Sequence, residues 1–398
     1  MKTRLRHCEP SAWRSWVILT VLLLGCLPPP RFIHAAVPPT VDPGNTAAPQ
    51  PGSILYGPSH PAQAFFGKAV AAGDFNGDGT NDLAISAPSA SPLMGRANSG
   101  AVYVFFGTAS LPSVLDTQAG AANAILVGAT SGEQLGTSLA SGDINNDGFD
   151  DLIAAAPEAA GSSGRVYGVL GSPALAGTID LAASPVALLI TGPSGRRIGQ
   201  VHVAVGDVNG DGFDDVFCQQ STGPDFRGRV YGVFGSALPR SVNLQTGSAD
   251  LTIIDAAALE PVGALALADL NADGFADVIG GAPDADGPSN TRTSAGETWV
   301  VFGGATLAAL RDLSNAPPDV TIYGANPSDH SGSTIGTGDF NGDGINDVAI
   351  AAFEGDGVSN TLLNSGEVHV FLGASNLAGA LDVAGVAGPP PAFSVFGR

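Results

Sequence analysis

The sequence predicts an all-β protein, a β-propeller of four-stranded blades with five complete units and a partial sixth. Three observations favour this fold. A nine-residue acidic motif occurs five times, its copies begin 62 to 70 residues apart, and similar apolar runs flank each copy. Only 13% of the 398 residues are charged, whereas 55 are Gly and 29 are Pro. This composition indicates short strands joined by turns rather than long solvated helices.

Each unit contains four predicted strands. Small residues precede the acidic motif, as in "GKAVAAGDF", and suit an inner strand crowded near a central axis. A compact apolar run follows the motif, as in "DLAISAP", and is typical of a strand buried on both faces. The third strand alternates in polarity and ends in Gly, as in "GAVYVFFG" (100–107), and a short fourth strand such as "ILVG" (125–128) follows a variable linker.

The fourth-strand pattern also occurs near both ends of the chain. It stands before the first acidic motif as "ILYG" (54–57) and again as "FSVFG" (393–397). There are therefore six predicted strands of this type but only five of each other type. Two interpretations stay open: one terminal strand closes a small ring, or the chain is the front part of a larger propeller.

The N-terminal region predicts export. Residues 1–36 read as a signal peptide, because basic residues precede the apolar run Trp16–Leu27 and small residues follow it. That run is too short to predict a transmembrane helix. Residues 37–52 form a Pro-rich linker, and residues 53–397 form the propeller. A second reading is a lipoprotein signal with a lipid anchor at Cys26, so the expected location is extracellular or cell-surface, with periplasmic or lipid-anchored alternatives.

The charge of the chain limits the partners that it can bind, and its cysteine content limits how it can be stabilised. The chain has a formal net charge of −21, and cleavage after Ala36 leaves 11 basic against 36 acidic residues, a net charge of −25. This excludes nucleic acid as the default partner. The same cleavage leaves Cys218 as the one cysteine, read as a small buried residue, so no intrachain disulfide can staple the exported protein.

The acidic motif predicts calcium binding. Positions 1, 3, 5 and 9 are Asp, Asn, Asp and Asp in all five copies, and position 6 is Gly. Oxygen-bearing side chains at alternate positions, with a main-chain carbonyl at position 7, make a shell that suits Ca²⁺. The loop lacks the Glu at position 12 that an EF-hand requires. A tight turn alone explains the Asn-Gly and Asp-Gly pairs but not the aspartates at positions 1 and 9.

These motifs resemble a known family. Phe66-Gly67 before the loop and "SAP" (86–88) or "GAP" (281–283) after it resemble the FG-GAP repeat of integrin α-subunit β-propellers and their bacterial relatives. The resemblance implies seven blades in a complete ring and about five Ca²⁺ sites in this chain. The ligands that it implies are Asp74, Asn76, Asp78, Thr80 and Asp82; Asp143, Asn145, Asp147, Phe149 and Asp151; Asp207, Asn209, Asp211, Phe213 and Asp215; Asp269, Asn271, Asp273, Phe275 and Asp277; and Asp339, Asn341, Asp343, Ile345 and Asp347.

The expected function is that of a non-catalytic binding or cell-adhesion module, stabilised by calcium. By the resemblance, its partner is an extracellular protein or glycan. The sequence contains no G-x-S-x-G elbow, no phosphate-binding Gly loop and no H-E-x-x-H motif, and we expect no catalytic residues. Two alternatives stay open: a carbohydrate- or phospholipid-active hydrolase or lyase that uses the propeller face, and a structural surface-layer array.

Overall fold

A computed structural model describes residues 54–58, 64–108, 112, 114–220, 227–256 and 262–397. The predicted signal peptide, the Pro-rich linker and Cys26 lie outside the described residues. Within them the protein is almost entirely β-structure, which confirms the predicted fold class. No helix in these ranges has the length and apolar character of a membrane-spanning segment.

Five antiparallel blades follow one another along the chain, each with four strands in the predicted order. From the inner to the outer strand, the blades are β2 (Val70–Gly73), β3 (Asp82–Ala87), β4 (Ala101–Phe105) and β6 (Ala124–Val127); β7 (Ser138–Gly142), β8 (Asp151–Ala156), β9 (Arg165–Val169) and β11 (Leu188–Thr191); β12 (Val203–Gly206), β13 (Asp215–Gln220), β14 (Arg229–Val233) and β16 (Leu251–Ile254); β17 (Ala264–Ala268), β18 (Asp277–Ala282), β19 (Glu297–Val301) and β21 (Val320–Tyr323); and β22 (Ser331–Gly338), β23 (Asp347–Ala352), β24 (Glu367–Phe371) and β26 (Phe393–Phe396). The short helical turns are η2 (Thr117–Ala119), α2 (Ala159–Ser162), η3 (Pro288–Asn290) and η4 (Val358–Asn360).

The variable linkers hold a further strand that the sequence did not predict. In each linker a short strand crosses back and pairs in parallel with the outer strand of the preceding blade, so β10 (Gly177–Asp180) extends blade 1 and β15 (Arg240–Asn243) extends blade 2. In the same way β20 (Leu310–Asp312) extends blade 3, and β25 (Gly379–Asp382) extends blade 4. Each of blades 1 to 4 is therefore clasped by the unit that follows it.

Arginine side chains hold three of these clasps. Arg292, in the connection between the second and third strands of blade 4, pairs through both terminal nitrogens with the carboxylate of Asp382 at the end of β25, at 2.7 and 2.8 Å. The carboxylate of Asp382 is fully buried. Two further pairs repeat this arrangement in blades 1 and 3: Arg96 with Asp180, and Arg227 with Asp312. Because each arginine binds the carboxylate through two nitrogens, the pair holds the clasping strand in place and also neutralises the charge of its aspartate.

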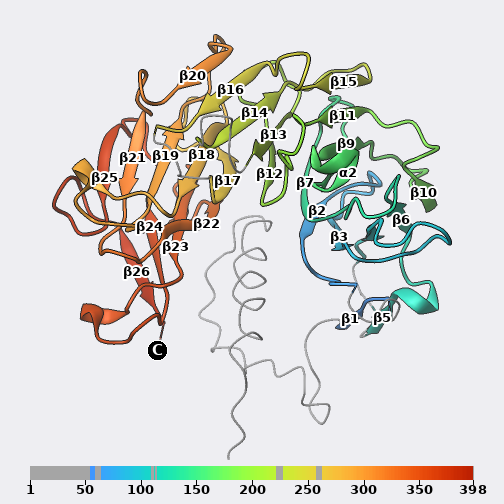
Figure 1. Cartoon of the computed structure of the whole chain (residues 1–398), viewed down its shortest axis with the longest axis horizontal. Coiled ribbons are helices and arrows are strands. Elements are labelled where there is room, and N and C mark those ends of the chain that lie inside the picture. Colours follow the sequence, from blue (N-terminus) through green and yellow to red (C-terminus); the bar gives the residue numbers. More distant parts are fainter. Residues whose placement is uncertain are drawn as a thin grey trace, which may run out of the picture.

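The blades form an open arc (Figure 1). The inner strands β2, β7, β12, β17 and β22 pack in succession. The C-terminal β26 pairs with β24 and completes blade 5, whereas β1 (Ile54–Tyr56) pairs with β5 (Val114–Asp116) and, among the described residues, with no third strand. Neither terminal strand closes a small ring, so the first of the two open interpretations is not what the structure shows.

The hydrophobic core lies between adjacent blades. In blades 1 to 4 the face that points to the next blade, here called the front face, buries aliphatic side chains against the following unit. Position 2 of the acidic loop contributes to this face: Phe75, Ile144, Val208 and Leu270 are at most 4% exposed. Cys218 is buried between blades 2 and 3, as expected for a small core residue.

Candidate calcium loops

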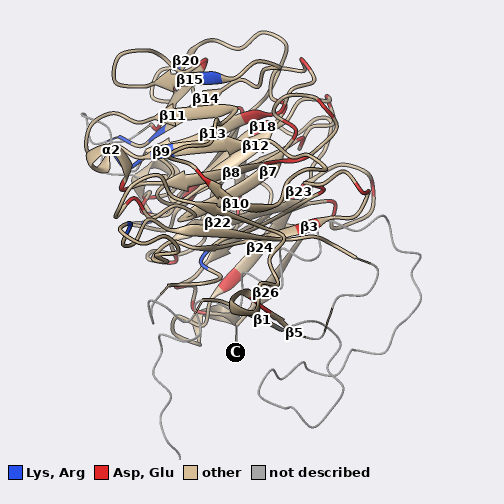
Figure 2. Ribbon diagram, turned by 90° about the vertical axis from the view of Figure 1, so that its right-hand side faces the viewer, with Lys and Arg blue, Asp and Glu red and all other residues tan. Residues whose placement is uncertain are grey.

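The five acidic loops lie at one end of the propeller, here called the loop face. Each loop joins the inner strand to the second strand of its blade, and acidic segments recur there at the starts of β3, β18 and β23 (Figure 2). Successive loops are joined by main-chain hydrogen bonds. The N–H of Asp150 donates to the carbonyl of Asp74 at 3.1 Å, and the N–H of Asp214 donates to the carbonyl of Asp143 at 3.0 Å. The loops of blades 1 to 3 thus form a continuous belt.

Main-chain N–H groups orient the side-chain oxygens at positions 1, 3 and 5. In the first loop the carboxylate of Asp74 accepts from the N–H of Gly79 at 2.7 Å, and the side-chain oxygen of Asn76 accepts from the N–H of Asp78 at 2.8 Å. The carboxylate of Asp78 accepts from the N–H of Thr80 at 2.8 Å. The same bonds recur in the other four loops. Each of these side chains accepts from a main-chain N–H a few residues later in the loop. The bond bends the main chain and holds the side-chain oxygen toward the inside of the loop.

The glycine at position 6 makes the bend of the loop. In all five loops it has a positive φ, between +83° and +90°, which a residue with a Cβ adopts only at a cost. Hydrogen bonds to the carboxylates at positions 1 and 5 also favour the ionised form of two of these side chains, Asp339 and Asp78. The side-chain amide of Asn76 and the N–H of Thr80 lower the pKa of Asp78, and the N–H of Gly344 is the main cause of the lowered pKa of Asp339.

The aspartate at position 9 has a structural role that sequence reasoning did not predict. In blade 2, Asp151 is buried and accepts two hydrogen bonds, from the N–H of Ile144 at 3.1 Å and from the N–H of Gly171 at 2.8 Å. The first donor is position 2 of the same loop, and the second is the glycine two residues after the third strand. The equivalent aspartates of the other blades make the same pair of bonds. Position 9 therefore ties the loop to the third strand.

The tie between the loop and the third strand requires a glycine at the position two residues after that strand. A Cβ at Gly171 would lie 2.3 Å from the carbonyl oxygen of Asp150, and a Cβ at Gly235 would lie 2.5 Å from that of Asp214. The main chain must therefore approach the loop closely for its N–H to reach the position-9 carboxylate. The repeated terminal Gly was visible in the sequence, but its partner was not.

Burial raises the pKa of the position-9 carboxylates of blades 1 to 4. The pKa of Asp151, Asp215 and Asp277 is raised to about 7, and that of Asp82 is raised as well. In each case removal of the carboxylate from water is the main cause, and the two accepted hydrogen bonds oppose it. A nearby cation would reverse this effect by favouring the charged form.

The donor set fits calcium in its chemistry. All the side chains are oxygen donors, and a carboxylate that accepts two hydrogen bonds retains lone pairs for a cation. Within the described residues, no group of three or more His, Cys, Asp or Glu side chains is close enough to hold a metal by itself. A calcium site here would therefore also need the asparagine oxygen and the main-chain carbonyl at position 7.

The residue at position 8 forms a second link between the loops of successive blades. The sequence did not predict this link, because position 8 varies among the repeats. The carboxylate of Asp150 accepts from the N–H of Asp74 at 2.7 Å, and that of Asp214 accepts from the N–H of Asp143 at 2.9 Å. Each bond joins a loop to the loop of the preceding blade. Burial raises the pKa of Asp214; the hydrogen bond from the N–H of Asp143 opposes this rise, and the negative charge of the Asp143 side chain adds to it.

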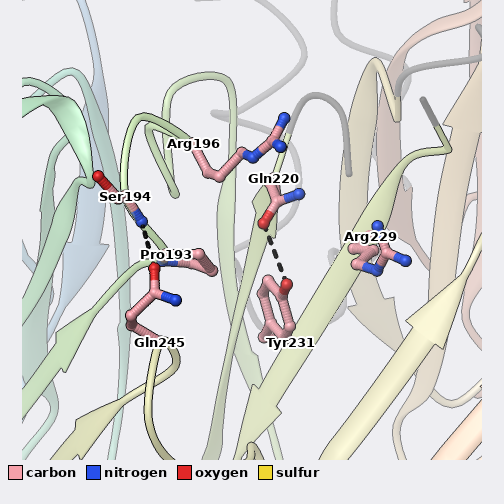
Figure 3. Close-up of a pocket in the computed structure, with 7 residues that line it drawn as sticks. All are labelled: Pro193, Ser194, Arg196, Gln220, Arg229, Tyr231 and Gln245. Atoms are coloured by element: carbon pink, nitrogen blue, oxygen red, sulfur yellow. Dashed lines mark hydrogen bonds between the residues drawn. The ribbon is translucent and has the colours of Figure 1, made fainter. Parts of the chain in front are cut away.

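A separate pocket lies between blades 2 and 3, toward the end of the propeller opposite the loop face. Its volume is about 370 Å³, and it is lined by Pro193, Ser194, Arg196, Gln220, Arg229, Tyr231 and Gln245. Figure 3 shows the hydroxyl of Tyr231 donating to the side-chain oxygen of Gln220, at 3.0 Å, with the two arginines on either side. The N–H of Ser194 donates to the side-chain oxygen of Gln245 at 2.9 Å. Sister blades have Ala at the position of Gln220, so the hydrogen bond between Tyr231 and Gln220 is particular to this unit.

The FG-GAP repeat family matches the chain at residues 66–105, 135–169, 262–301 and 331–371. These segments are units 1, 2, 4 and 5. Unit 3 lies outside the matches and carries "QQS" (219–221) where unit 4 has "GAP", yet it folds as a blade with the same strand order.

Curated relatives extend this similarity. The chain is 30% identical over 185 residues to integrin alpha-PS2 of Drosophila melanogaster, which covers 44% of the chain and 12% of the relative. It is 32% identical over 158 residues to integrin alpha-4 of Xenopus laevis, covering 38% and 14%, and 32% identical over 112 residues to phosphatidylinositol-glycan-specific phospholipase D of Bos taurus, covering 28% and 13%. The matched segments thus span only a small part of these relatives.

The FG-GAP motif that the sequence predicts is supported by three findings. The family matches four repeats, the chain is similar to integrin α-subunits, and all five blades have the same strand order. The chain contains four FG-GAP repeats and is similar to integrin α-subunits over part of its length.

Proposed function

We propose that this chain is an exported, non-catalytic binding module whose blades are held together by calcium. The observation that carries the proposal is the repeated loop geometry, in which main-chain N–H groups hold the oxygens of positions 1, 3 and 5 in the same arrangement in five blades. Hard oxygen donors in a loop that bends at glycine suit Ca²⁺. With Cys218 buried and alone in the described residues, metal would take the place of disulfides.

The residues that would hold each ion are those at positions 1, 3, 5 and 9, with the carbonyl of position 7. Calcium would supply positive charge beside the position-9 carboxylate, whose pKa burial raises to about 7 in blades 2, 3 and 4. The tie between the loop and the third strand would then hold an ionised acceptor at neutral pH. The role of calcium would then be to stabilise the blade, and it would not require a substrate to approach the loop.

The ligand would bind at the opposite end of the propeller. Connections on a rigid scaffold commonly carry binding residues, and the pocket between blades 2 and 3 combines the guanidinium groups of Arg196 and Arg229 with amides and a phenol. Such groups suit a carboxylate-bearing or hydroxyl-rich ligand, as on an acidic protein segment or a glycan. The similarity to integrin α-subunits supports an extracellular or cell-surface ligand.

Two experiments test the proposal separately. Isothermal titration of the chelator-treated full chain with CaCl₂ should give about five sites, whereas absence of heat would exclude the calcium role. Arrays of glycans and matrix proteins should then be probed in millimolar Ca²⁺ and in EDTA. Binding that is present with calcium and is weakened by Arg196→Ala would support the pocket, and absence of binding in both buffers would refute the binding role.

A catalytic function is the second candidate, and the match to phosphatidylinositol-glycan-specific phospholipase D is the observation that favours it. That match covers 13% of the enzyme, so it supports a shared segment more than a shared active site. Turnover of phospholipid or polysaccharide substrates by the purified chain would revive this candidate. Calcium-dependent assembly into sheets without a foreign ligand would favour a surface-layer array.

A further inference from the structure

A pair of side chains recurs at the junctions between blades, on the half of the third strand that lies away from the loop face. The third strand begins with Arg165 in blade 2, with Arg229 in blade 3 and with Glu297 in blade 4, and an aromatic residue follows two positions later. The aromatic residues pack with the preceding blade. Residues two apart on a strand share a face, so the charge at the start of the strand also faces the junction. This charge is basic in blades 2 and 3 and acidic in blade 4.

At the junction between blades 1 and 2 the base has an acid beside it. Arg165 donates to the hydroxyl of Tyr167 at 3.3 Å, and this hydroxyl donates to the carboxylate of Glu133 at 3.5 Å. Glu133 is fully buried. The three side chains form one connected group of a base, a phenol and an acid, so this junction balances its own charge.

At the junction between blades 2 and 3 a second base stands in place of the acid. Leu135 and Ile198 are equivalent, because the N–H of each donates to the residue two positions before the third strand of the preceding blade, at 3.0 and 3.2 Å. Two residues before Ile198, at the position of Glu133, the chain has Arg196. Arg196 and Arg229 both line the pocket, and none of its seven lining residues is acidic (Figure 3).

The uncharged side chains of the pocket add hydrogen-bond donors and apolar surface. The side-chain oxygen of Gln220 accepts from the hydroxyl of Tyr231, and that of Gln245 accepts from the N–H of Ser194. Because protein donors occupy both amide oxygens, the glutamines contact a ligand as donors, through their N–H₂ groups. A guanidinium has five N–H donors, so one partner within the protein does not exhaust it. Pro193 and the tyrosine ring complete the wall. A donor-rich pocket of this kind suits an anionic ligand with further acceptor oxygens.

We propose that the pocket binds one acidic sugar residue, a hexuronate. Its carboxylate would lie between the guanidinium groups of Arg196 and Arg229, and its hydroxyl oxygens would accept from Gln220 and Gln245. The inference rests on the proposed function in placing the ligand at this pocket, and it adds the class of ligand. Guanidinium groups match the planar carboxylate. A sugar ring carries several further oxygens, whereas an acidic amino-acid side chain ends at its carboxylate.

The size and charge of the molecule favour a single residue with one negative charge. The volume of about 370 Å³ is near the lower end for small-molecule sites, so the pocket holds one sugar rather than an extended segment. The chain has a net charge of −21 and repels a polyanion over most of its surface. A uronate whose neighbours in the glycan are neutral therefore fits better than a polyuronate.

NMR titration of the full chain in millimolar Ca²⁺ with galacturonate and glucuronate tests the proposal. Galactose and glucose are matched ligands, because they carry CH₂OH in place of the carboxylate. A ligand of this size should bind with a Kd of roughly 1 to 10 mM. The neutral sugars should bind at least roughly tenfold more weakly.

Two neighbouring arginines provide matched variants. Arg196→Gln removes one guanidinium from the pocket and should raise the Kd for the uronates at least roughly tenfold. Arg197→Gln removes the same charge from the adjacent residue, which pairs with Glu158 and does not line the pocket, and should change the Kd less than about twofold. Gln220→Ala introduces the residue of the sister blades and should weaken binding while the blade still folds. Thermal melting of each variant checks the fold.

Several results would overturn the proposal. These are equal affinities for the acidic and neutral sugars, no binding of the uronates up to about 50 mM, equal effects of Arg196→Gln and Arg197→Gln, or a Kd that Gln220→Ala leaves unchanged. The proposed function can survive this failure. If the arrays return an acidic peptide or a neutral glycan whose binding depends on Arg196, the binding role stands and the hexuronate assignment is wrong.

Discussion

Replacing Asp151 tests the structural tie of position 9 separately from the proposed calcium site. Its carboxylate is fully buried and accepts from two main-chain N–H groups, so Asp151→Ala leaves both donors without a partner. Each buried unsatisfied donor costs about 1 to 3 kcal/mol, a range of about 2 to 6 kcal/mol in all. Burial raises the pKa of Asp151 to about 7, so the carboxyl is already partly neutral at pH 7 and removal of its charge gives little relief. We expect a loss of at least about 2 kcal/mol in EDTA.

The matched control is Asp147→Ala, at position 5 of the same loop. Asp147 is exposed, and water can replace its bond to the N–H of Phe149, so its loss in EDTA should be below about 1 kcal/mol. Urea unfolding of both variants, in EDTA and in calcium, is the assay. In saturating calcium both should also lose the metal contribution, roughly 4 kcal/mol at a thousandfold excess over the Kd. Equal losses for the two variants in EDTA would refute the structural role of position 9.

Three further predictions follow from the same contacts. Gly171→Ala forces a Cβ to 2.3 Å from a carbonyl oxygen and should lower the free energy of unfolding by about 1 to 3 kcal/mol, whereas Gly338→Ala, whose Cβ meets nothing closer than 3.7 Å, should change it by less than about 0.5 kcal/mol; urea titration of both decides. Arg292→Met removes the cation that pairs with the fully buried carboxylate of Asp382 on β25 and should lower the free energy of unfolding by about 3 to 5 kcal/mol. Arg197→Met, at a more exposed ion pair, should lower it by less than about 1 kcal/mol. Similar melting temperatures for the two variants would contradict this. In EDTA the position-9 carboxylates of blades 2, 3 and 4 have a pKa of about 7 in the folded chain against 3.8 unfolded, so the folded state binds more protons between these values and stability should fall as pH rises from 4 to 7; a flat or rising melting temperature in this window would be inconsistent, and calcium should remove the fall.

The blade construction was accessible from the sequence because it rests on local patterns repeated five times. Alternation, apolar runs and glycine turns placed the four strands of every blade within a residue or two, as the fourth strand shows: "ILVG" at 125–128 against β6 at 124–127. The clasping strands were missed for a physical reason. A strand of three or four residues that pairs in parallel with another blade has a non-local partner, and its own segment carries no alternation long enough to identify it.

The candidate site divides in the same way. Positions 1, 3 and 5 act within the loop, through hydrogen bonds between neighbouring residues, so their arrangement follows a local pattern of the sequence. Position 9 also acts across the blade, on a glycine twenty residues later in the chain, as Asp151 does on Gly171. Position 8 acts between blades, as Asp150 does on Asp74. Long-range acceptors of this kind are visible only when the strands have been placed.

The separation of the two ends of the propeller constrains how calcium could affect binding. The loops and their ties lie at the loop face, and the pocket between blades 2 and 3 lies toward the other end. Calcium held in the loops would therefore not contact a ligand in that pocket, and its effect would act through the stability of the blades that carry it. Ligand affinity should then follow the folded fraction of the chain: at a temperature where the calcium-free protein stays folded, removal of calcium should leave the affinity nearly unchanged. An affinity that changes with calcium while the fold persists would instead require the ion, or a calcium-dependent movement of the blades, at the ligand site.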